Sequence, residues 1–586
     1  MIFGKHINRY YLRYLGWILL GMAALTCVDY CQMVIPKLYR TVINGMNTGF
    51  VDGTTPFTMD YLLDQVCMPL LVVILTMVVG RFLWRICFFG VAVKVEKHLR
   101  DRMFDRARHL SREYYQVNKV GDLMSLFTND LDTIQESVGW GVMMLFDAVV
   151  MGSLAMYNMW QMDRFLTTLA LIPMALLLTA ATVLGKYMTK KWDERQEAFS
   201  RLSDFAQESF SGIAVIKAFV KEARELMAFR KLNLENEKAN IAFTRASVLM
   251  RVLVIFFIEV VVCLILGYGG YLVYVGTFNA GMLLEFLSYF LAVVWPIMAV
   301  AELIDMTSRG AASLKRVSQL LDAEVHVKDA PGVTPLPRIH GGVEFRNLTF
   351  RYPGADYNAL EDISFTIAPG ENVGLVGKTG AGKSTLVDLL LRTYNVPDNT
   401  IFVDGQDVNT VSIRDVRAGC AYVPQDNFLF SDTIANNIAF ASDIDSREAI
   451  VEAAKLADVD SNISQFQLGY DTVLGERGVT VSGGQKQRIS IARALMKQAP
   501  ILILDDSVSA VDTKTETAIL ENLRNTRQGL TTILIAHRIS TIEKMDKILF
   551  LEQGRLSGVG THEELYHQNP AYRKMVDLQK LEQEGM

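Results

Sequence analysis

With 586 residues, the chain is too long for one compact domain, because domains typically hold about 100–200 residues. Hydrophobic residues make up 51% of it and charged residues 21%, and the mean hydropathy of +0.22 is high for a soluble protein of this size. The net charge of −5 argues against nucleic acid as a partner, and the six cysteines show no metal-binding spacing.

Six apolar runs account for most of the hydrophobic excess. A bilayer core about 30 Å thick is crossed by about 20 helical residues, and each run reaches that length. Any single run could be a buried helix of a soluble domain, but six together predict a membrane α-helical bundle. The expected spans are residues 15–36, 68–93, 138–159, 165–188, 248–275 and 282–304.

Basic residues between the spans predict the orientation. Residues 94–112 and 186–201 are rich in Lys and Arg, which favours the cytoplasmic side, so both termini are expected inside. The first loop, with Asp52, Asp60 and Asp64, is then expected outside. The two basic segments are helical in pattern, and we expect them to extend the membrane helices toward a cytoplasmic docking partner.

The composition changes after the sixth span. Residues 323–342 contain three prolines and read as a linker, so residues 1–322 are expected to form the membrane domain. Residues 343–586 alternate strand-like and helical stretches, which predicts an α/β domain. Residues 343–350 and 372–376 are expected strands, and residues 384–391 are an expected helix.

A phosphate-binding loop follows the second of these strands. Glycines let the backbone wrap closely around phosphate, and backbone N–H groups at a helix start attract the anion. The lysine is expected to reach the β- and γ-phosphates of ATP, and the serine to bind Mg²⁺. The motif G-x-x-x-x-G-K-[ST] is matched in full by Gly377, Lys378, Thr379, Gly380, Ala381, Gly382, Lys383 and Ser384, and Thr385 follows in the helix.

A fully apolar stretch, residues 501–504, ends in Asp505 and Asp506. Such a stretch is typical of a central parallel strand whose carboxyl end meets the nucleotide. We therefore expect Asp505 to hold Mg²⁺, directly or through water.

Further motifs give the domain a resemblance to the nucleotide-binding domain of ABC transporters. Val481-Ser482-Gly483-Gly484-Gln485 is similar to the ABC signature, with Val where the family usually has Leu. Tyr352 matches the aromatic residue that stacks on adenine. Residues 422–425, 509–512 and 535–538 resemble the Q-, D- and H-loops, and residues 475–478 a segment of exporters. In the membrane half, residues 118–130 and 208–219 resemble the two coupling segments.

The resemblance implies an exporter in which two such domains pair head to tail around ATP. Ser482, Gly483, Gly484 and Gln485 would then complete the site of the partner, so this chain would act only in a pair. Gln425 and His537 would take part in hydrolysis together with Asp506, and Gln425 would also approach Mg²⁺. The implied place is a bacterial plasma membrane, with lipids around the spans and the ATP-binding domain in the cytoplasm.

Asp506 departs from the family, which usually has Glu there as the base for the attacking water. Asp and Glu have similar acidity, so the difference lies in reach. Asp at this position resembles the degenerate half of heterodimeric bacterial exporters, which implies a partner chain bearing Glu and a slow ATP site on this chain. A homodimer that tolerates Asp is the alternative.

The sequence carries less information about the substrate than about the ATP site. Charged residues inside spans are expensive, which makes Asp29, Asp147 and Glu259 candidates for substrate contact, with structural pairing as the alternative. Aromatic and Met residues in the spans could line an adaptable apolar cavity, although lipid-facing packing explains each of them singly. We expect amphipathic small molecules of the multidrug type. A homodimeric lipid or peptide exporter and a non-transporting ABC regulator are the competing interpretations.

Overall fold

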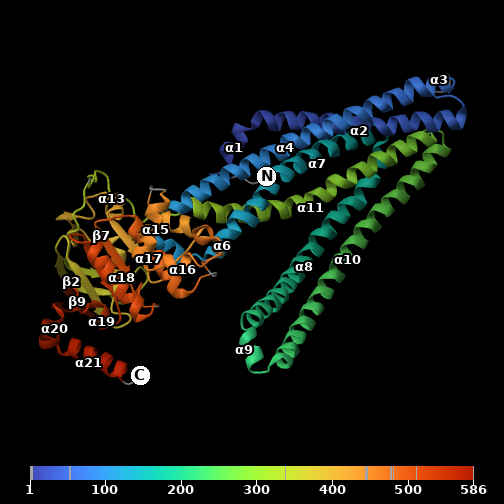
Figure 1. The fold of residues 1–586 in the computed structure, drawn as a ribbon. Coiled ribbons are helices and arrows are strands. Elements are labelled where there is room, and N and C mark those ends of the chain that lie inside the picture. Colours follow the sequence, from blue (N-terminus) through green and yellow to red (C-terminus); the bar gives the residue numbers. More distant parts are fainter. Residues whose placement is uncertain are drawn as a thin grey trace. The chain divides into compact units, whose positions relative to one another are not determined.

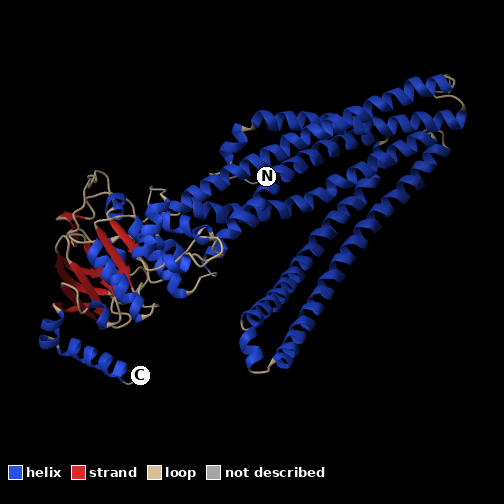
Figure 2. Ribbon diagram, in the orientation of Figure 1, coloured by secondary structure: helices blue, strands red, loops and turns tan. Residues whose placement is uncertain are grey.

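The computed structural model describes residues 4–51, 55–336, 338–442, 446–475, 478, 481–509 and 511–584. The chain divides into two compact units (Figures 1 and 2). A helical unit comprises Met1–Arg106 and Leu123–Asp322, and a sheet-containing unit comprises Ala107–Asp122 and Ala323–Met586.

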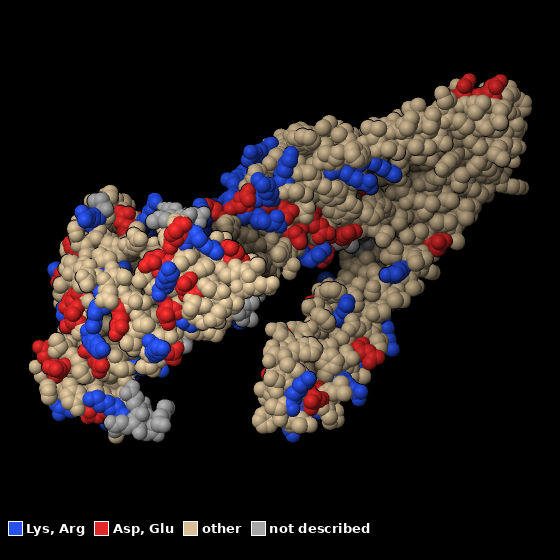
Figure 3. Space-filling model, in the orientation of Figure 1, with Lys and Arg blue, Asp and Glu red and all other residues tan. Residues whose placement is uncertain are grey.

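Six long helices dominate the helical unit, and all six are long and apolar enough to cross a membrane. Each covers one of the expected spans, the fifth to within one residue because its helix ends at Tyr274, and each continues as helix beyond at least one end of the span. This continuation accounts for the helical pattern of the basic segments. On the face shown in Figure 3, charged side chains are sparse over the part of the long helices toward α3 and more numerous toward their other ends. The elements are α1 (Asn8–Arg13), α2 (Leu15–Thr48), α3 (Met59–Leu62), the π-helical turn η1 (Leu63–Cys67), α4 (Met68–His109), α6 (Val120–Ser125), the π-helical turn η2 (Leu126–Asp130), α7 (Leu131–Met162), α8 (Arg164–Ser211), α9 (Ile213–Ala218), α10 (Glu222–Tyr274) and α11 (Ala280–Asp322).

Close backbone approach joins α2, α4 and α7. A Cβ added at Gly80 of α4 would lie 2.6 Å from Val28 of α2, and one at Gly139 of α7 would lie 2.9 Å from Ala92 of α4. The turn between α7 and α8 is a single residue, Asp163, whose carboxylate accepts from the Leu166 backbone N–H and caps α8. Small residues thus set the helix spacing, as is usual where lipid surrounds a bundle.

The sheet-containing unit holds two sheets. A six-stranded sheet has the order β10-β9-β3-β8-β7-β6, parallel except for β10, and an antiparallel sheet has the order β2-β1-β4-β5. The expected strands and the helix after the phosphate loop are confirmed within one or two residues. The strands are β1 (Val343–Phe350), β2 (Leu360–Ile367), β3 (Asn372–Gly377), β4 (Ile401–Val403), β5 (Gln406–Asp407), β6 (Cys420–Val423), β7 (Ile501–Asp505), β8 (Thr531–Ile535), β9 (Lys547–Glu552) and β10 (Arg555–Gly560).

Helices cover these sheets and complete two buried apolar cores. One core joins β7 and β8 to α17, and the other joins β1 and β3 to α12. The helices of this unit are α5 (Arg112–Val117), α12 (Lys383–Leu390), α13 (Ile413–Ala418), α14 (Ile434–Ala439), α15 (Arg447–Leu456), α16 (Asp460–Ile463), the 3-10 turn η3 (Gly469–Asp471), α17 (Gly483–Met496), α18 (Thr513–Thr526), α19 (Ile539–Ile542), α20 (His562–Gln568) and α21 (Pro570–Glu584).

The stretch expected to be a linker is tied to the sheet-containing unit. The Asp329 carboxylate accepts from the Ile413 N–H, the Asp415 carboxylate accepts from the Leu336 N–H, and Thr334 forms a bridge with Val411. Its described residues therefore run along the surface of the α/β fold.

Candidate functional site

The phosphate loop lies between the carboxyl end of β3 and the start of α12. Gly380 and Gly382 have φ values of +81° and +96°, which L side chains rarely adopt. A Cβ at Gly377 would collide with the Leu551 carbonyl oxygen, so there is no room for a side chain at this position. The loop thus has the shape that lets backbone N–H groups surround a phosphate.

Lys383, the first residue of α12, is folded back onto this loop. Its Nζ donates to the carbonyl oxygens of Gly377 at 2.8 Å and Lys378 at 3.1 Å, and the side chain is buried. Burial lowers the pKa of the ammonium, while the charges of Asp505 and Asp506 oppose that shift. An arriving polyphosphate would replace weak carbonyl partners with anionic ones.

Asp505 ends the buried strand β7 and is 2% exposed. Burial raises the pKa of its carboxyl, whereas a hydrogen bond from Ser384 and the charge of Lys383 oppose the rise. The Tyr422 hydroxyl lies 3.5 Å from the same carboxylate. Ser384 and Asp505 therefore bring a hydroxyl and a carboxylate together, an oxygen donor set that suits Mg²⁺.

Asp506 occupies an unusual backbone conformation, with φ of +48°. Its N–H donates to the Ile535 carbonyl, and its carbonyl accepts from the Ser509 hydroxyl at 2.9 Å, so hydrogen bonds hold this conformation. Asp and Asn tolerate the left-handed region better than most residues because their short polar side chains bond locally. The backbone here accommodates Asp readily and Glu at some cost.

These groups line one cavity of about 500 Å³. The structure brings together the predicted residues Tyr352, Thr379, Gly380, Gly382, Lys383, Ser384, Thr385, Gln425, Asp505, Asp506 and His537. Sequence reasoning missed the other lining residues, which are Tyr357, Asn358, Ala359, Gln553 and Gly554. They lie in the β1–β2 and β9–β10 connections and carry no recognisable motif. Of the predicted loop residues, Gly377 and Lys378 contribute the carbonyl oxygens described above, and Ala381 is buried in the core.

Tyr352 is held at the rim by contacts on two sides. Its hydroxyl lies 2.9 Å from the Thr385 Oγ1, and its ring packs edge-on against Phe350 and Tyr394. The ring is thereby fixed beside the phosphate loop, as an adenine-stacking residue would need to be.

Ser482 and Gln485 form a capping box at the start of α17. The Gln485 N–H donates to the Ser482 hydroxyl, and the Ser482 N–H donates to the Gln485 side chain at 2.9 Å. This segment is not among the residues that line the cavity. Among the described residues, no group accepts a hydrogen bond from the N–H of Gly483 or Gly484.

Two of the sequence matches and the first loop are only partly described. Glu476, Arg477 and Ala510, which belong to the exporter-like segment and the D-loop match, and Asp52 of the first loop lie outside the described residues.

Residues 107–122, which include α5 and the first five residues of the first coupling match, belong to the sheet-containing unit. Arg112, at the start of α5, donates from Nη1 to the Asp388 carboxylate of α12 at 2.6 Å. Burial raises the pKa of the Asp388 carboxyl and the Arg112 charge opposes that rise. An ion pair thus joins α5 to the helix that begins at the phosphate loop. No sequence motif predicted this contact.

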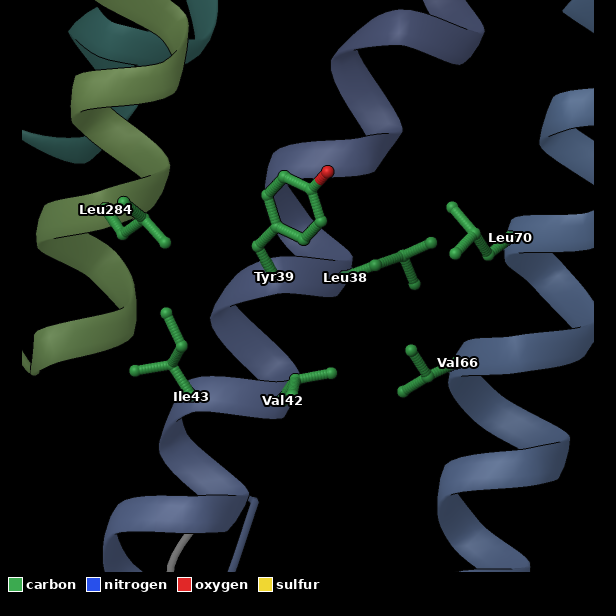
Figure 4. Close-up of a pocket in the computed structure, with 7 residues that line it drawn as sticks. All are labelled: Leu38, Tyr39, Val42, Ile43, Val66, Leu70 and Leu284. Carbon is green, nitrogen blue, oxygen red and sulfur yellow. The ribbon is translucent and has the colours of Figure 1, made fainter.

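The intramembrane acids have different surroundings. Asp29 of α2 is buried, Asp147 of α7 is half-buried and accepts from the Trp295 indole N–H at 2.8 Å, and Glu259 of α10 is exposed. Glu285 of α11, by contrast, is paired with Arg40 at 3.3 Å. A separate cavity of about 410 Å³ is lined by apolar side chains and the Tyr39 ring, from α2, η1, α4 and α11 (Figure 4).

These features define a membrane-embedded helical bundle joined to a P-loop ATPase domain. Two family models match the chain. The model described as "ABC transporter transmembrane region" matches residues 18–297, and the model described as "ABC transporter" matches residues 360–509. The chain belongs to the ABC transporter family, as an exporter-type half-transporter with one ATP-binding domain, and is an integral membrane protein.

Known proteins resemble it over nearly its whole length. A probable multidrug resistance ABC transporter ATP-binding/permease protein of Bacillus subtilis is 35% identical over 99% of this chain and 97% of that one. An ATP-dependent lipid A-core flippase of Syntrophus aciditrophicus is 34% identical over 87% of this chain and 85% of that one. The solved structure of a bacterial Atm1-family ABC exporter with ATP bound has a TM-score of 0.77 at 27% identity and covers 98% of both chains.

Proposed function

We propose that this chain is one subunit of a heterodimeric exporter that uses ATP to move amphipathic small molecules out across a bacterial plasma membrane. The observation that carries this proposal is the cavity in which the phosphate loop, Asp505 and Asp506 meet, in a chain with six apolar spans. The ATP-binding domain then lies in the cytoplasm, on the side of the basic segments.

In this proposal each residue of the cavity has a role in holding ATP. Tyr352 stacks on adenine, the phosphate loop surrounds the phosphates, and Lys383 leaves its carbonyl partners to reach the β- and γ-phosphates. Bound Mg²⁺ would neutralise charge on those phosphates, and Ser384, Asp505 and Gln425 are its proposed ligands. His537 contacts the γ-phosphate side, where hydrolysis takes place.

Asp506 makes this site slow. The family base is one methylene longer, and a shift of about 1 Å in a catalytic group can cost about 100-fold in rate. A partner chain bearing Glu would supply the fast site, and Ser482, Gly483, Gly484 and Gln485 of this chain would complete it. ATP then holds the two chains together, and hydrolysis in the fast site releases them, which switches the bundle between two states.

Replacing Ser482 by alanine tests the role of the signature segment. The loss of the cap costs about 1 kcal/mol of helix stability, and the loss of a phosphate contact should in addition lower turnover in the partner's site at least tenfold. Thr561 provides a matched control, because it forms the same capping box with Glu564 at α20. ATPase assays of the purified complex should show a large loss for Ser482→Ala and little for Thr561→Ala. Equal losses would mean that capping alone matters.

The substrate is proposed to meet the bundle at the intramembrane acids Asp29, Asp147 and Glu259, with apolar parts against the aromatic and Met side chains. The function can be tested with the tagged chain, purified together with the proteins that bind it and reconstituted in inside-out proteoliposomes. The measurement is ATP-dependent uptake of dyes. Uptake of several unrelated amphipathic dyes supports it, and a complex that takes up none of them contradicts it.

A homodimeric lipid exporter is the second candidate, favoured by the similarity to a protein named as a lipid A-core flippase. The apolar cavity of Figure 4 would then accept an acyl chain. Recovery of this chain without any second transporter subunit, together with lipid-stimulated ATPase activity, would favour that candidate.

A further inference from the structure

An unpaired carboxylate lies inside the helical unit. Asp29 of α2 is 2% exposed, and no group among the described residues donates a hydrogen bond to its Oδ2. A buried acceptor that lacks a donor costs about 1–3 kcal/mol, and more if it is charged. Such a group persists where another species, a proton or a ligand, completes it.

The neighbour of this carboxylate is a second acid. Asp147 of α7 is the acid nearest in effect to Asp29, and it stands on a helix that packs against α2. Two carboxylates offer only acceptors to each other, so this contact becomes a hydrogen bond only when one proton is added. Inside a bundle both cannot stay ionised without a cation between them or beside them.

Trp295 of α11 completes the group. Its indole N–H donates to the Asp147 Oδ2 at 2.8 Å, and 41% of the residue is exposed. Asp147 is half-buried, so exposure increases from the buried Asp29 through Asp147 to Trp295. Carboxylates behind an exposed indole ring are a combination that attracts organic cations through charge and through the ring face.

The other charged groups on the neighbouring helices are either paired or exposed. On α11 and α2, Glu285 accepts from Tyr289 and pairs with Arg40, and the Tyr289 hydroxyl also lies 3.2 Å from the Met33 carbonyl. On α4, which packs on α2 at Gly80, Arg81 and Arg85 are exposed and form no ion pair within the described part of the chain. The remaining titratable groups of α2 at this level are the thiols of Cys27 and Cys31 and the hydroxyl of Tyr30. Among the residues that the structure describes, no Lys or Arg therefore acts on Asp29.

We propose that Asp29, Asp147 and Trp295 form a binding site for a lipophilic organic monocation, which displaces one proton that the two carboxylates share when the site is empty. This inference rests on the proposed export function and names the charge of its substrates. When the cation binds, both carboxylates become ionised and the shared proton leaves to water, so the net charge of the site stays at −1.

A metal ion fits this site poorly. Ca²⁺ and Mg²⁺ take about six or more oxygen ligands, and the described residues contain no group of three or more His, Cys, Asp or Glu side chains with metal-binding geometry. Two carboxylates and an indole ring suit a single diffuse positive charge better.

Binding of radiolabelled tetraphenylphosphonium to the purified complex in nanodiscs, without ATP, tests the site apart from transport. This cation has no titratable group, so any effect of pH comes from the protein. We expect its affinity to rise by up to tenfold per pH unit while the pair holds its proton and then to level off. The double substitution Asp29→Asn and Asp147→Asn should lower the affinity at least tenfold. Asp147→Asn alone should move the pH at which the affinity levels off to a lower value, because the remaining carboxylate no longer has a second acid beside it.

Two controls separate this site from a general effect of charge. Glu302→Gln removes an exposed acid two turns along α11 from Trp295, and it should leave tetraphenylphosphonium binding unchanged. Tetraphenylborate, an anion of nearly the same shape, should bind wild type and the double variant alike. The unfolding temperature of the double variant should not fall, because two amides of similar size replace the acids without leaving a charge buried in the bundle. Affinity that is independent of pH, or undiminished in the double variant, would overturn the site. A complex that binds the cation but moves no amphipathic dye on ATP would instead refute the export function.

Discussion

Replacing Lys383 by alanine is expected to lower the affinity of this chain's site for ATP at least 100-fold. A hydrogen bond to a charged group contributes about 1.5–3 kcal/mol, and the ammonium can make two such bonds to phosphate oxygens, so the loss exceeds about 3 kcal/mol. The variant loses the two hydrogen bonds from Nζ to the loop carbonyls, but it retains Gly380 and Gly382, whose positive φ values determine the shape of the loop. Photolabelling of the purified complex with an azido-ATP analogue, with the labelled chain identified on a gel, measures the effect.

Lys455→Ala is the control for this experiment. Lys455 is an exposed lysine of α15 and does not line the nucleotide cavity. The control should label as wild type does. Full labelling of the Lys383→Ala chain would show that ATP does not bind at the phosphate loop in the way described.

Replacing Asp506 by glutamate is expected to raise ATP turnover at this chain's site by about 10- to 100-fold, because the longer side chain restores the reach of the family base. The left-handed backbone at Asp506 predicts a side effect, since residues other than Gly, Asn and Asp lose about 1 kcal/mol there. The variant should therefore unfold at a slightly lower temperature while hydrolysing faster. Single-turnover hydrolysis by the purified complex, with the partner's base removed, measures this site alone.

The same position offers a test in the opposite direction. If this chain's site is slow, Asp506→Ala should leave most of the steady-state turnover of the complex intact, because the partner's site carries it. Complete loss of turnover in Asp506→Ala would contradict the slow site and favour a homodimer whose two aspartates both catalyse.

The nucleotide cavity was largely predictable because its chemistry is local in sequence. Gly380 and Gly382 must be glycine for backbone reasons, Lys383 and Ser384 follow them directly, and Asp505 ends an apolar strand. A short motif therefore carries both the residue types and their geometry.

The rest of the cavity depends on contacts between distant segments. Gln553 and Gly554 reach the site because β9 pairs with β3, and Asn358 because β2 pairs with β1. Hairpin residues of this kind have no sequence signal of their own. The ion pair between Arg112 and Asp388 joins residues 276 positions apart, and no sequence motif predicts it either.

In the membrane bundle, too, some features could be predicted from the sequence and others depend on contacts between distant segments. Hydropathy predicted six spans because the bilayer imposes a length on each, and the structure confirms them. The continuation of each helix beyond its span was indicated only by the pattern of the basic segments. Which intramembrane acid is paired depends on packing: Glu285 meets Arg40, whereas Asp29 meets Asp147, and no spacing in the sequence distinguishes the two cases.

The central claim is that ATP held at Lys383 closes the paired domains and that this closure changes the membrane bundle. Spin labels on exposed residues at two connections of the helical unit, Met59→Cys and Val275→Cys, report on the bundle within this chain once the six natural cysteines are replaced. Pulsed electron paramagnetic resonance of the reconstituted complex should show a different distance distribution when ATP is added, and the Lys383→Ala variant should keep the ATP-free distribution. An identical distribution with and without ATP, or an unchanged ATP response in the variant, would contradict the account.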